Sequence, residues 1–498
     1  MKLRHGLFAV LLIFVMLFFC LPVPGQAMEG SFGENLTWKL EDGCLTISGN
    51  GEMPKDGGVP WHDCRTNITT VVVEPGVTTV KDSAFSGCTQ LTSVILPESV
   101  QIIGDRAFSS CTSLEEIHLP DAVTYIGYSA FEECTSLVRI HIPNNVTKIN
   151  MFAFEDCTSL TEVSGAANLT HLEAHAFSGC INLVTIALPD TLISLGTNVF
   201  EGCHSLQSIT LPDSITVLPF STFLDCKSLV HCTLPSNLTE IGNSAFAHCT
   251  SLTEIVLPDT LTTMDFSVFE GCTSLQSITI PHRLSSIPRE AFKDCESLTT
   301  VNLPPLLRYI DYRAFYGCKR LTSIHIPIGL NGIGDSAFAY CTSLKSVHIT
   351  DLGNWTRIRF ENATSNPLSY GGVLYEDGLL VTDLVLPEEC TSIRSYAFYG
   401  CSSIRTVIFP KNITGVCSNA FLNCNNLTSV TFLGRPEVSD RAFDGCSKLV
   451  STTYPREEPD TSSSSASQKQ IFVYVWCGFC ALIIVFTVLK DAHERRGY

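Results

Sequence analysis

Positive charge is scarce in this 498-residue chain, which has 31 Lys and Arg residues against 49 Asp and Glu residues. A net charge of -18 lacks the basic footprint of a nucleic-acid-binding protein, so we predict no nucleic-acid partner. Charged residues of both signs make up only 16% of the chain, whereas hydrophobic residues make up 45%. This balance favours a chain with a continuous buried core.

Catalytic and cofactor-binding motifs are also missing from the sequence. It contains no G-x-S-x-G nucleophile elbow, no P-loop, no H-E-x-x-H zinc motif and no dinucleotide fingerprint. Cys477 and Cys480 have the spacing of a redox or zinc pair, but they lie in an apolar run predicted below to span a membrane. We therefore predict that the protein is not an enzyme and has no catalytic residue, cofactor or metal site.

What the sequence does contain is a repeat, in which a small residue precedes Phe and Cys follows three positions later. Twelve copies are spaced by 23 residues, and three more follow a gap of 60 residues. A fixed period of this length, with Leu-x-x-Ile-x-Leu inside each unit, is typical of a leucine-rich-repeat solenoid. The fifteen Phe positions are Phe85, Phe108, Phe131, Phe154, Phe177, Phe200, Phe223, Phe246, Phe269, Phe292, Phe315, Phe338, Phe398, Phe421 and Phe443.

The predicted fold class is an α/β solenoid that is mostly β. It is a curved array of about fifteen 23-residue units with a parallel sheet on one face. Within residues 91–97, Val94 and Leu96 should point inward and Ser93 and Ile95 outward, because strand side chains alternate. The A-F-x-x-C segment is predicted to form a short helical or 3₁₀ turn.

Long apolar runs occur at both ends of the chain. Lys2 and Arg4 precede an apolar run that ends in a small-residue cleavage site at Ala27, which indicates a secretory signal peptide, with an uncleaved anchor as the alternative. Residues 471–489 contain no charge and are long enough to span a membrane once. Lys490 and Arg495 follow this run, so the positive-inside rule places the C-terminus in the cytoplasm and the repeats outside the cell.

These features divide the chain into eight predicted segments. Residues 28–69 do not fit the repeat and are placed to cover its first open face. Cys44 and Cys64 lie in this segment, and the sequence leaves open whether they form a disulfide. The segments are 1–27 (signal peptide), 28–69 (N-terminal cap), 70–350 (first repeat array), 351–382 (non-repeat island), 383–450 (second repeat array), 451–470 (flexible stalk), 471–489 (transmembrane helix) and 490–498 (cytoplasmic tail).

Cysteine and histidine each form columns in the repeat. Fifteen of the 23 Cys residues sit in one column, where neighbouring Cβ atoms run parallel instead of converging as a disulfide requires, so we predict buried, reduced thiols. His118 and His141 share an outward strand position, as do His325 and His348. Each pair is compatible with a metal site, a solvated face or part of a binding surface, but two nitrogens without a carboxylate or thiolate make a poor metal site.

The repeat, I-G-x-x-A-F-x-x-C-x-x-L-x-x-I-x-L-P, resembles the BspA-type leucine-rich repeats of bacterial surface proteins over residues 28–450. Residues 38–54 resemble the lead-in of such proteins, and Trp355, Asn366-Pro367 and Leu374-Tyr375 resemble their recurrent island. The resemblance implies a cell-surface protein used in adhesion or host contact, with extracellular-matrix binding known for some members. It carries over no catalytic residues.

The predicted function is that of a membrane-anchored cell-surface adhesion protein whose repeat face and island recognise an extracellular protein or glycan, host matrix included. A structural envelope protein without a specific ligand is the alternative, and an enzyme acting in the island is a third. The candidate ligand-binding residues are Glu116, His118, Arg139, His141, Glu254, His325, His348, Trp355 and Tyr375.

Overall fold

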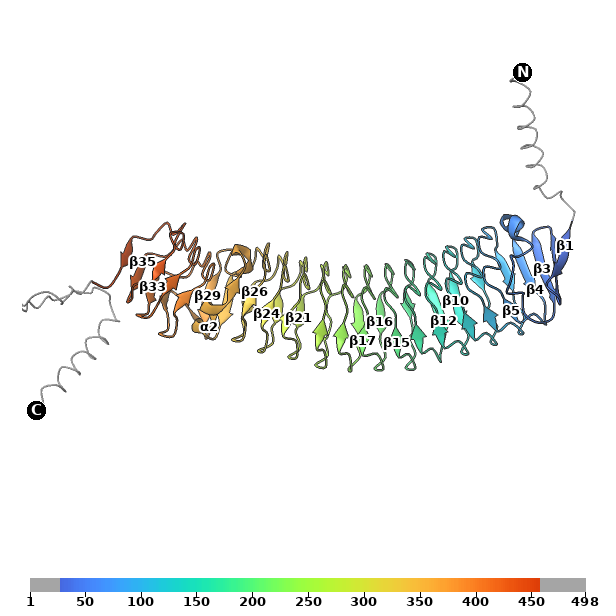
Figure 1. The fold of residues 1–498 in the computed structure, drawn as a ribbon, viewed down its shortest axis with the longest axis horizontal. Coiled ribbons are helices and arrows are strands. Elements are labelled where there is room, and N and C mark those ends of the chain that lie inside the picture. Colours follow the sequence, from blue (N-terminus) through green and yellow to red (C-terminus); the bar gives the residue numbers. More distant parts are fainter. Residues whose placement is uncertain (1–26, 457–498) are drawn as a thin grey trace, which may run out of the picture. The chain divides into compact units, whose positions relative to one another are not determined.

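The computed structural model describes residues 27–456, and one compact unit extends to Tyr454. Within this unit the turns of the chain follow one another in a single row, from the N-terminal strands to the C-terminal repeats (Figure 1). Among the described residues, no helix has the length and apolar character needed to cross a membrane. The predicted signal peptide, except Ala27, and the predicted membrane helix at 471–489 lie outside the described residues.

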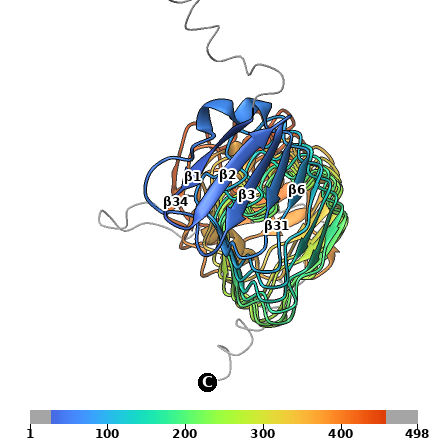
Figure 2. The ribbon, with the colours of Figure 1, turned by 90° about the vertical axis from the view of Figure 1, so that its right-hand side faces the viewer.

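Three antiparallel strands stand at the N-terminal end of the unit (Figure 2): β1 (Met28–Phe32), β2 (Leu36–Glu41) and β3 (Cys44–Gly49). After the 3₁₀ helix η1 (His62–Asn67), β4 (Thr70–Val73) pairs with β3 in parallel. The parallel stacking of the repeats begins there, because β4 in turn pairs with the strand of the next turn.

A first row of strands is formed by the Leu-x-x-Ile-x-Leu part of each unit. Each pairs in parallel with the strand 23 residues later, and the alternating burial of β10 shows that every second side chain points out. The row is interrupted at residues 253–257, which form no strand. Its members are β6 (Ser93–Ile95), β8 (Glu116–Ile117), β10 (Arg139–Ile142), β12 (Glu162–Gly165), β14 (Thr185–Ile186), β16 (Ser208–Thr210), β18 (His231–Thr233), β21 (Ser277–Thr279), β23 (Thr300–Asn302), β25 (Ser323–His325) and β27 (Ser346–Ile349).

A second row of parallel strands, which the sequence did not lead us to expect, is formed by the V-T-x-I segment. Each strand has two residues, of which the second is buried and the first faces outward in most turns. The members are β5 (Thr79–Val80), β7 (Ile102–Ile103), β9 (Tyr125–Ile126), β11 (Lys148–Ile149), β13 (His171–Leu172), β15 (Ser194–Leu195), β17 (Val217–Leu218), β19 (Glu240–Ile241), β20 (Thr263–Met264), β22 (Ser286–Ile287), β24 (Tyr309–Ile310) and β26 (Gly332–Ile333). Each turn therefore has two outer strand faces.

The A-F-x-x-C segment forms neither an α-helix nor a 3₁₀ helix, contrary to the prediction. In the turn around Phe131, Ser129 and Glu133 have φ angles of 53° and 57°, in the left-handed region that no right-handed helix contains. The Phe131 amide donates a hydrogen bond of 2.8 Å to the Ala153 carbonyl of the next turn. The segment is a series of tight turns that stacks on its neighbours through backbone hydrogen bonds.

The repeated Phe side chains form one buried column. From Phe85 to Phe338, neighbouring ring centroids lie 5.2–6.1 Å apart and the rings are close to parallel. Trp61 extends the column at its N-terminal end, 5.9 Å from Phe85 and tilted by 16°. The constant step in the sequence thus becomes a constant stacking distance in the core, as predicted for the solenoid.

The island is built into the solenoid. It contains α2 (Leu352–Arg357), β28 (Arg359–Phe360), the 3₁₀ helix η2 (Ala363–Ser365), β29 (Val373–Glu376) and β30 (Leu379–Leu380). β28 pairs with β26 and continues the second row, whereas β29 pairs with β27 and continues the first. The strands that follow are β31 (Asp383–Val385), β33 (Thr406–Phe409), β35 (Ser429–Phe432) and β37 (Ser451–Thr453) in the first row and β32 (Ser392–Ile393), β34 (Gly415–Val416) and β36 (Glu437–Val438) in the second.

Trp61 and Trp355 play the same part at the start of the two Phe columns. In a regular turn, the carbonyl before each Phe accepts a hydrogen bond from the Phe amide of the preceding turn. At the first turn of each array, an indole Nε1 takes that place: Trp61 donates to Ala84 at 2.8 Å and Trp355 to Ala397 at 2.9 Å. Both carbonyls are therefore satisfied where a preceding Phe is absent.

The ladder thiols are buried, as predicted. From Cys111 to Cys341, each Sγ donates to the carbonyl of the Phe 26 residues earlier, at 3.0–3.2 Å. Burial raises the pKa of the Cys134 thiol to about 12, so the nucleophilic thiolate is suppressed at neutral pH. Cys44 is a free thiol, so the disulfide with Cys64 that the sequence left open is not formed.

We expect the native protein to resist thiol alkylation along the column, because the thiolate is scarce and the sulfur is enclosed. Cys417, which is exposed, serves as an internal positive control. Iodoacetamide treatment followed by peptide mass spectrometry should show rapid labelling of Cys417 and labelling of Cys134 only after unfolding. Equal labelling rates at the two positions in the native protein would contradict this packing.

Candidate functional site

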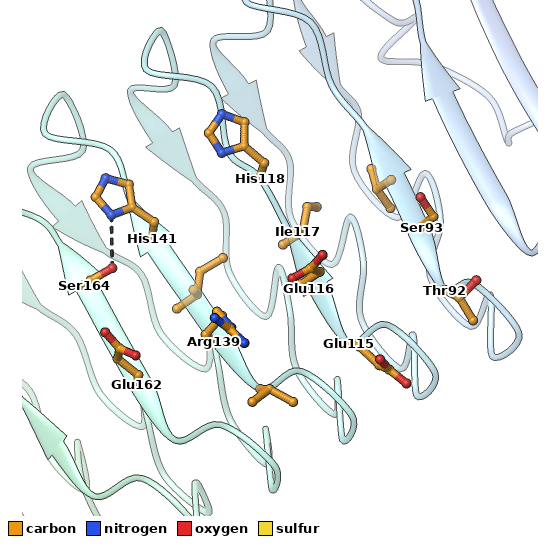
Figure 3. Close-up of a pocket in the computed structure, with 13 residues that line it drawn as sticks. Thr92, Ser93, Glu115, Glu116, Ile117, His118, Arg139, His141, Glu162 and Ser164 are labelled. Atoms are coloured by element: carbon orange, nitrogen blue, oxygen red, sulfur yellow. Dashed lines mark hydrogen bonds between the residues drawn. The ribbon is translucent and has the colours of Figure 1, made fainter.

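The outward side chains of β8, β10 and β12 line a shallow groove of about 780 Å³, drawn in Figure 3. Four predicted residues meet there because they occupy two adjacent outward columns on neighbouring strands: Glu116, His118, Arg139 and His141. The structure therefore brings together the first part of the predicted set.

Charge alternates across this groove. Arg139 pairs in register with Glu116 on one side and Glu162 on the other, so its guanidinium projects between two carboxylates. The second column carries His141, whose Nδ1 lies 3.0 Å from the Ser164 Oγ (Figure 3). With Glu115 at its edge, the groove has an excess of acidic groups, which favours a partner with basic or hydroxyl groups.

Glu162 and Ser164 belong to this surface although they were not predicted. Each lies 23 residues after a predicted residue, Arg139 and His141 respectively, so the repeat period was a sufficient signal to find them.

The second group consists of His325, His348 and Tyr375 on β25, β27 and β29, which pair in register. The imidazole centroids of His325 and His348 lie 4.4 Å apart, and the rings are tilted by 14°. The Tyr375 ring lies 4.7 Å from that of His348 with a tilt of 12°. We call these three stacked side chains the ring row.

The ring row presents edges, not faces, to the solvent. The two faces of His348 are covered by His325 and Tyr375, because all three rings are stacked along the array. Their edges carry the imidazole nitrogens and the phenol oxygen, and a neutral imidazole offers one donor and one acceptor. The ring row is therefore a line of hydrogen-bonding groups spaced by one strand.

Partial burial lowers the pKa of His348, and the adjacent His325 adds an effect of the same sign. Because the unfolded chain then binds the proton more tightly than the folded chain, this group destabilises the fold as the pH falls below about 6.5. We expect His325→Asn to raise the pKa of His348 part of the way back, measured by an NMR titration of the imidazole carbon-bound protons. A Thr300→Ala control should leave it unchanged, and so would His325→Asn if the stacked pair were not formed.

Two predicted residues do not join either group. Glu254 is exposed in the stretch where the first row is interrupted, apart from the groove and from the ring row. Trp355 is only 1% exposed and its indole is hydrogen-bonded to the Ala397 carbonyl, so it is a core residue that no docked ligand can touch. A buried role was not separable from a surface role in the sequence, since Trp occurs in both.

The chain belongs to a known repeat family. The family model described as a BspA type leucine-rich repeat region matches residues 62–183, 147–276, 266–366 and 374–471, which is most of the chain. This agrees with the resemblance noted in the repeat unit and with the parallel rows of strands. Among curated proteins, no match was found.

Several solved structures are similar to this chain. A leucine-rich cell surface protein from Faecalibacterium prausnitzii A2-165 is 26% identical, over 68% of this chain and 99% of that chain, with a TM-score of 0.40. A leucine-rich repeat protein from Bacteroides ovatus is 23% identical, over 84% of this chain and 93% of that chain, with a TM-score of 0.42. A leucine-rich repeat protein of T. pallidum is 27% identical, over 45% of this chain and 90% of that chain, with a TM-score of 0.28.

Proposed function

We propose that this protein is a cell-surface binding protein that recognises an extracellular protein or glycan in adhesion. In this proposal the segment at 471–489 anchors it in the membrane and the repeats lie outside the cell. Membership in the repeat family supports a binding role, because repeat solenoids offer extended surfaces on which ligands dock.

The ring row is the observation that carries the proposal. Three outward side chains that follow different sequence steps, 23 residues from His325 to His348 and 27 from His348 to Tyr375, are aligned in one stack. An amphipathic aromatic side chain held by its neighbours loses little conformational freedom on binding, which favours affinity. A ligand with regularly spaced hydroxyl or amide groups matches the exposed nitrogens and phenol oxygen.

The acidic groove supplies a second contact region on the same row of strands. It lies eight repeats before the ring row, since His141 and His325 occupy the same column. An extended ligand such as a matrix protein or a long glycan is large enough to meet both, and the excess of carboxylates in the groove suits basic side chains or hydroxyls.

The test uses a soluble fragment, Met28–Tyr454, on an array of matrix proteins and glycans. We expect binding to at least one of them, and a His348→Ala variant should bind about tenfold more weakly, because the middle ring of the stack is lost. Thr300→Ala, an exposed change on the neighbouring β23, is the matched control and should bind as the wild type does.

Two results would contradict the proposal. One is no detectable binding across the array, and the other is equal binding by the wild type and the His348→Ala variant. If deletion of the protein also weakened the cell envelope while attachment stayed unchanged, the structural alternative would be favoured.

A further inference from the structure

A second candidate site lies in the other row of strands, where one turn lacks outward side chains. β24, β26 and β28 pair in register, so that Gly332 stands between Tyr309 and Arg359. Two positions later, Gly334 again has no side chain, with Asp311 in the preceding turn and Glu361 in the following one. The result is a notch one repeat wide, of about 620 Å³.

The two glycines differ in what holds them there. A Cβ at Gly334 would lie 2.6 Å from the Tyr312 amide nitrogen, so the close approach of the backbones requires glycine. A Cβ at Gly332 would meet the Arg359 carbonyl and the Tyr309 ring at 3.6 Å, which is ordinary contact. Backbone packing thus leaves room for a side chain at Gly332, and its absence opens the notch.

The notch exposes the face of an aromatic ring. Tyr309 is 54% exposed, and its outward neighbours in the column are Ser286 and Gly332, which are too small to cover the ring. This is the reverse of the ring row, in which neighbouring rings cover each other's faces. An uncovered tyrosine face is a surface on which the C–H groups of a ligand can stack.

The polar groups of the notch are balanced in charge. Asp311 and Glu361 supply two carboxylates, and Arg359 and Arg394 supply two guanidiniums. Arg359 and Glu361 already form an ion pair at 3.0 Å, while the Asp311 carboxylate accepts a hydrogen bond of 2.7 Å from the Tyr312 amide. Further donors and acceptors therefore stand around the aromatic face without a net charge to attract an ionic ligand.

The width of the notch limits the ligand. Tyr309 and Arg359 are on strands two spacings apart, which is roughly 10 Å. A gap of this size admits one ring between the phenol face and the guanidinium, with its substituents directed to the carboxylates and to the exposed Asn331.

We propose that this notch binds one pyranose ring of a neutral glycan. The C–H face of the sugar stacks on Tyr309, and its hydroxyls donate to Asp311 and Glu361 and accept from Arg394. The site is on a different row of strands from the ring row, and it stands whether or not the ring row binds a ligand.

The experiment is isothermal titration calorimetry of the purified full-length protein with neutral tetrasaccharides of glucose, galactose, mannose and N-acetylglucosamine. A tetrasaccharide of galacturonic acid is the anionic comparison. We expect at least one neutral sugar to bind, and Gly332→Tyr, which fills the notch, to weaken it by at least about tenfold. Tyr309→Ala, which removes the stacking face, should have a similar effect.

Ser194→Tyr is the matched control, because Ser194 occupies the equivalent position on β15. It should bind as the wild type does, and so should His348→Ala, which separates this site from the ring row. Melting curves of the variants establish that they fold. If Gly332→Tyr does not fold, Tyr309→Ala alone decides the matter.

Three results would overturn the proposal. They are no binding of any neutral tetrasaccharide, wild-type affinity in folded Gly332→Tyr or Tyr309→Ala, and preferential binding of the galacturonic acid tetrasaccharide.

Discussion

Phe200→Ala is expected to lower the free energy of unfolding by about 3–5 kcal/mol, because it removes a fully buried ring and leaves a cavity in a packed core. The Phe200 ring is held between Phe177 at 6.1 Å and Phe223 at 5.6 Å. Both stacking contacts are lost in the variant, and the flanking turns can close the gap only by shifting the strands that they carry.

The measurement is hydrogen exchange followed by mass spectrometry across a denaturant series, which reports the stability of each group of repeats separately. Ser208→Ala, an exposed change on β16 eight residues further along the chain, is the control and should cost less than about 0.5 kcal/mol. Equal effects of the two substitutions would mean that the inner and outer faces have been assigned the wrong way round.

Trp355→Ala should separate the melting of the two repeat arrays. Stability in a solenoid is carried between neighbouring turns, so the loss of one interface weakens the coupling of the repeats on either side. The indole both fills the core beside Phe360, at 5.3 Å, and donates to the Ala397 carbonyl. We expect a loss of about 3–5 kcal/mol at this interface.

Hydrogen exchange should then show that residues 383–450 exchange at a lower denaturant concentration than residues 70–350. Trp355→Phe is the informative control, because it keeps a ring but loses the hydrogen bond, which is worth about 1 kcal/mol. One unchanged cooperative transition in Trp355→Ala would contradict the role assigned to the island.

The solenoid could be predicted from the sequence because one step of 23 residues places chemically identical side chains above each other. The Phe column and the buried Cys column both follow from that step. The second row of strands could not, since a strand of two residues such as Tyr125–Ile126 has no alternation to recognise. The turns around Phe131 were mistaken for helix because left-handed residues such as Ser129 and Glu133 carry no glycine signal.

The candidate site was only partly predictable for the same reason. Glu116, His118, Arg139 and His141 follow the regular period, so their grouping was visible in advance. Tyr375 joins His348 only because the island restores the strand register after an irregular step, and this depends on the pairing of β27 with β29. The notch was missed because glycine at Gly332 signals by the side chain that it lacks.

Tyr375→Phe tests the central claim most directly, which is that the edges of the ring row carry ligand binding. The substitution preserves the stack on His348 and removes only the phenol oxygen from the exposed edge. Once a ligand of the fragment Met28–Tyr454 is known, its dissociation constant should rise by roughly fivefold in Tyr375→Phe, as expected for one lost hydrogen bond. Wild-type affinity in Tyr375→Phe together with lost binding in Tyr375→Ala would show that a ring face, not the ring edges, meets the ligand.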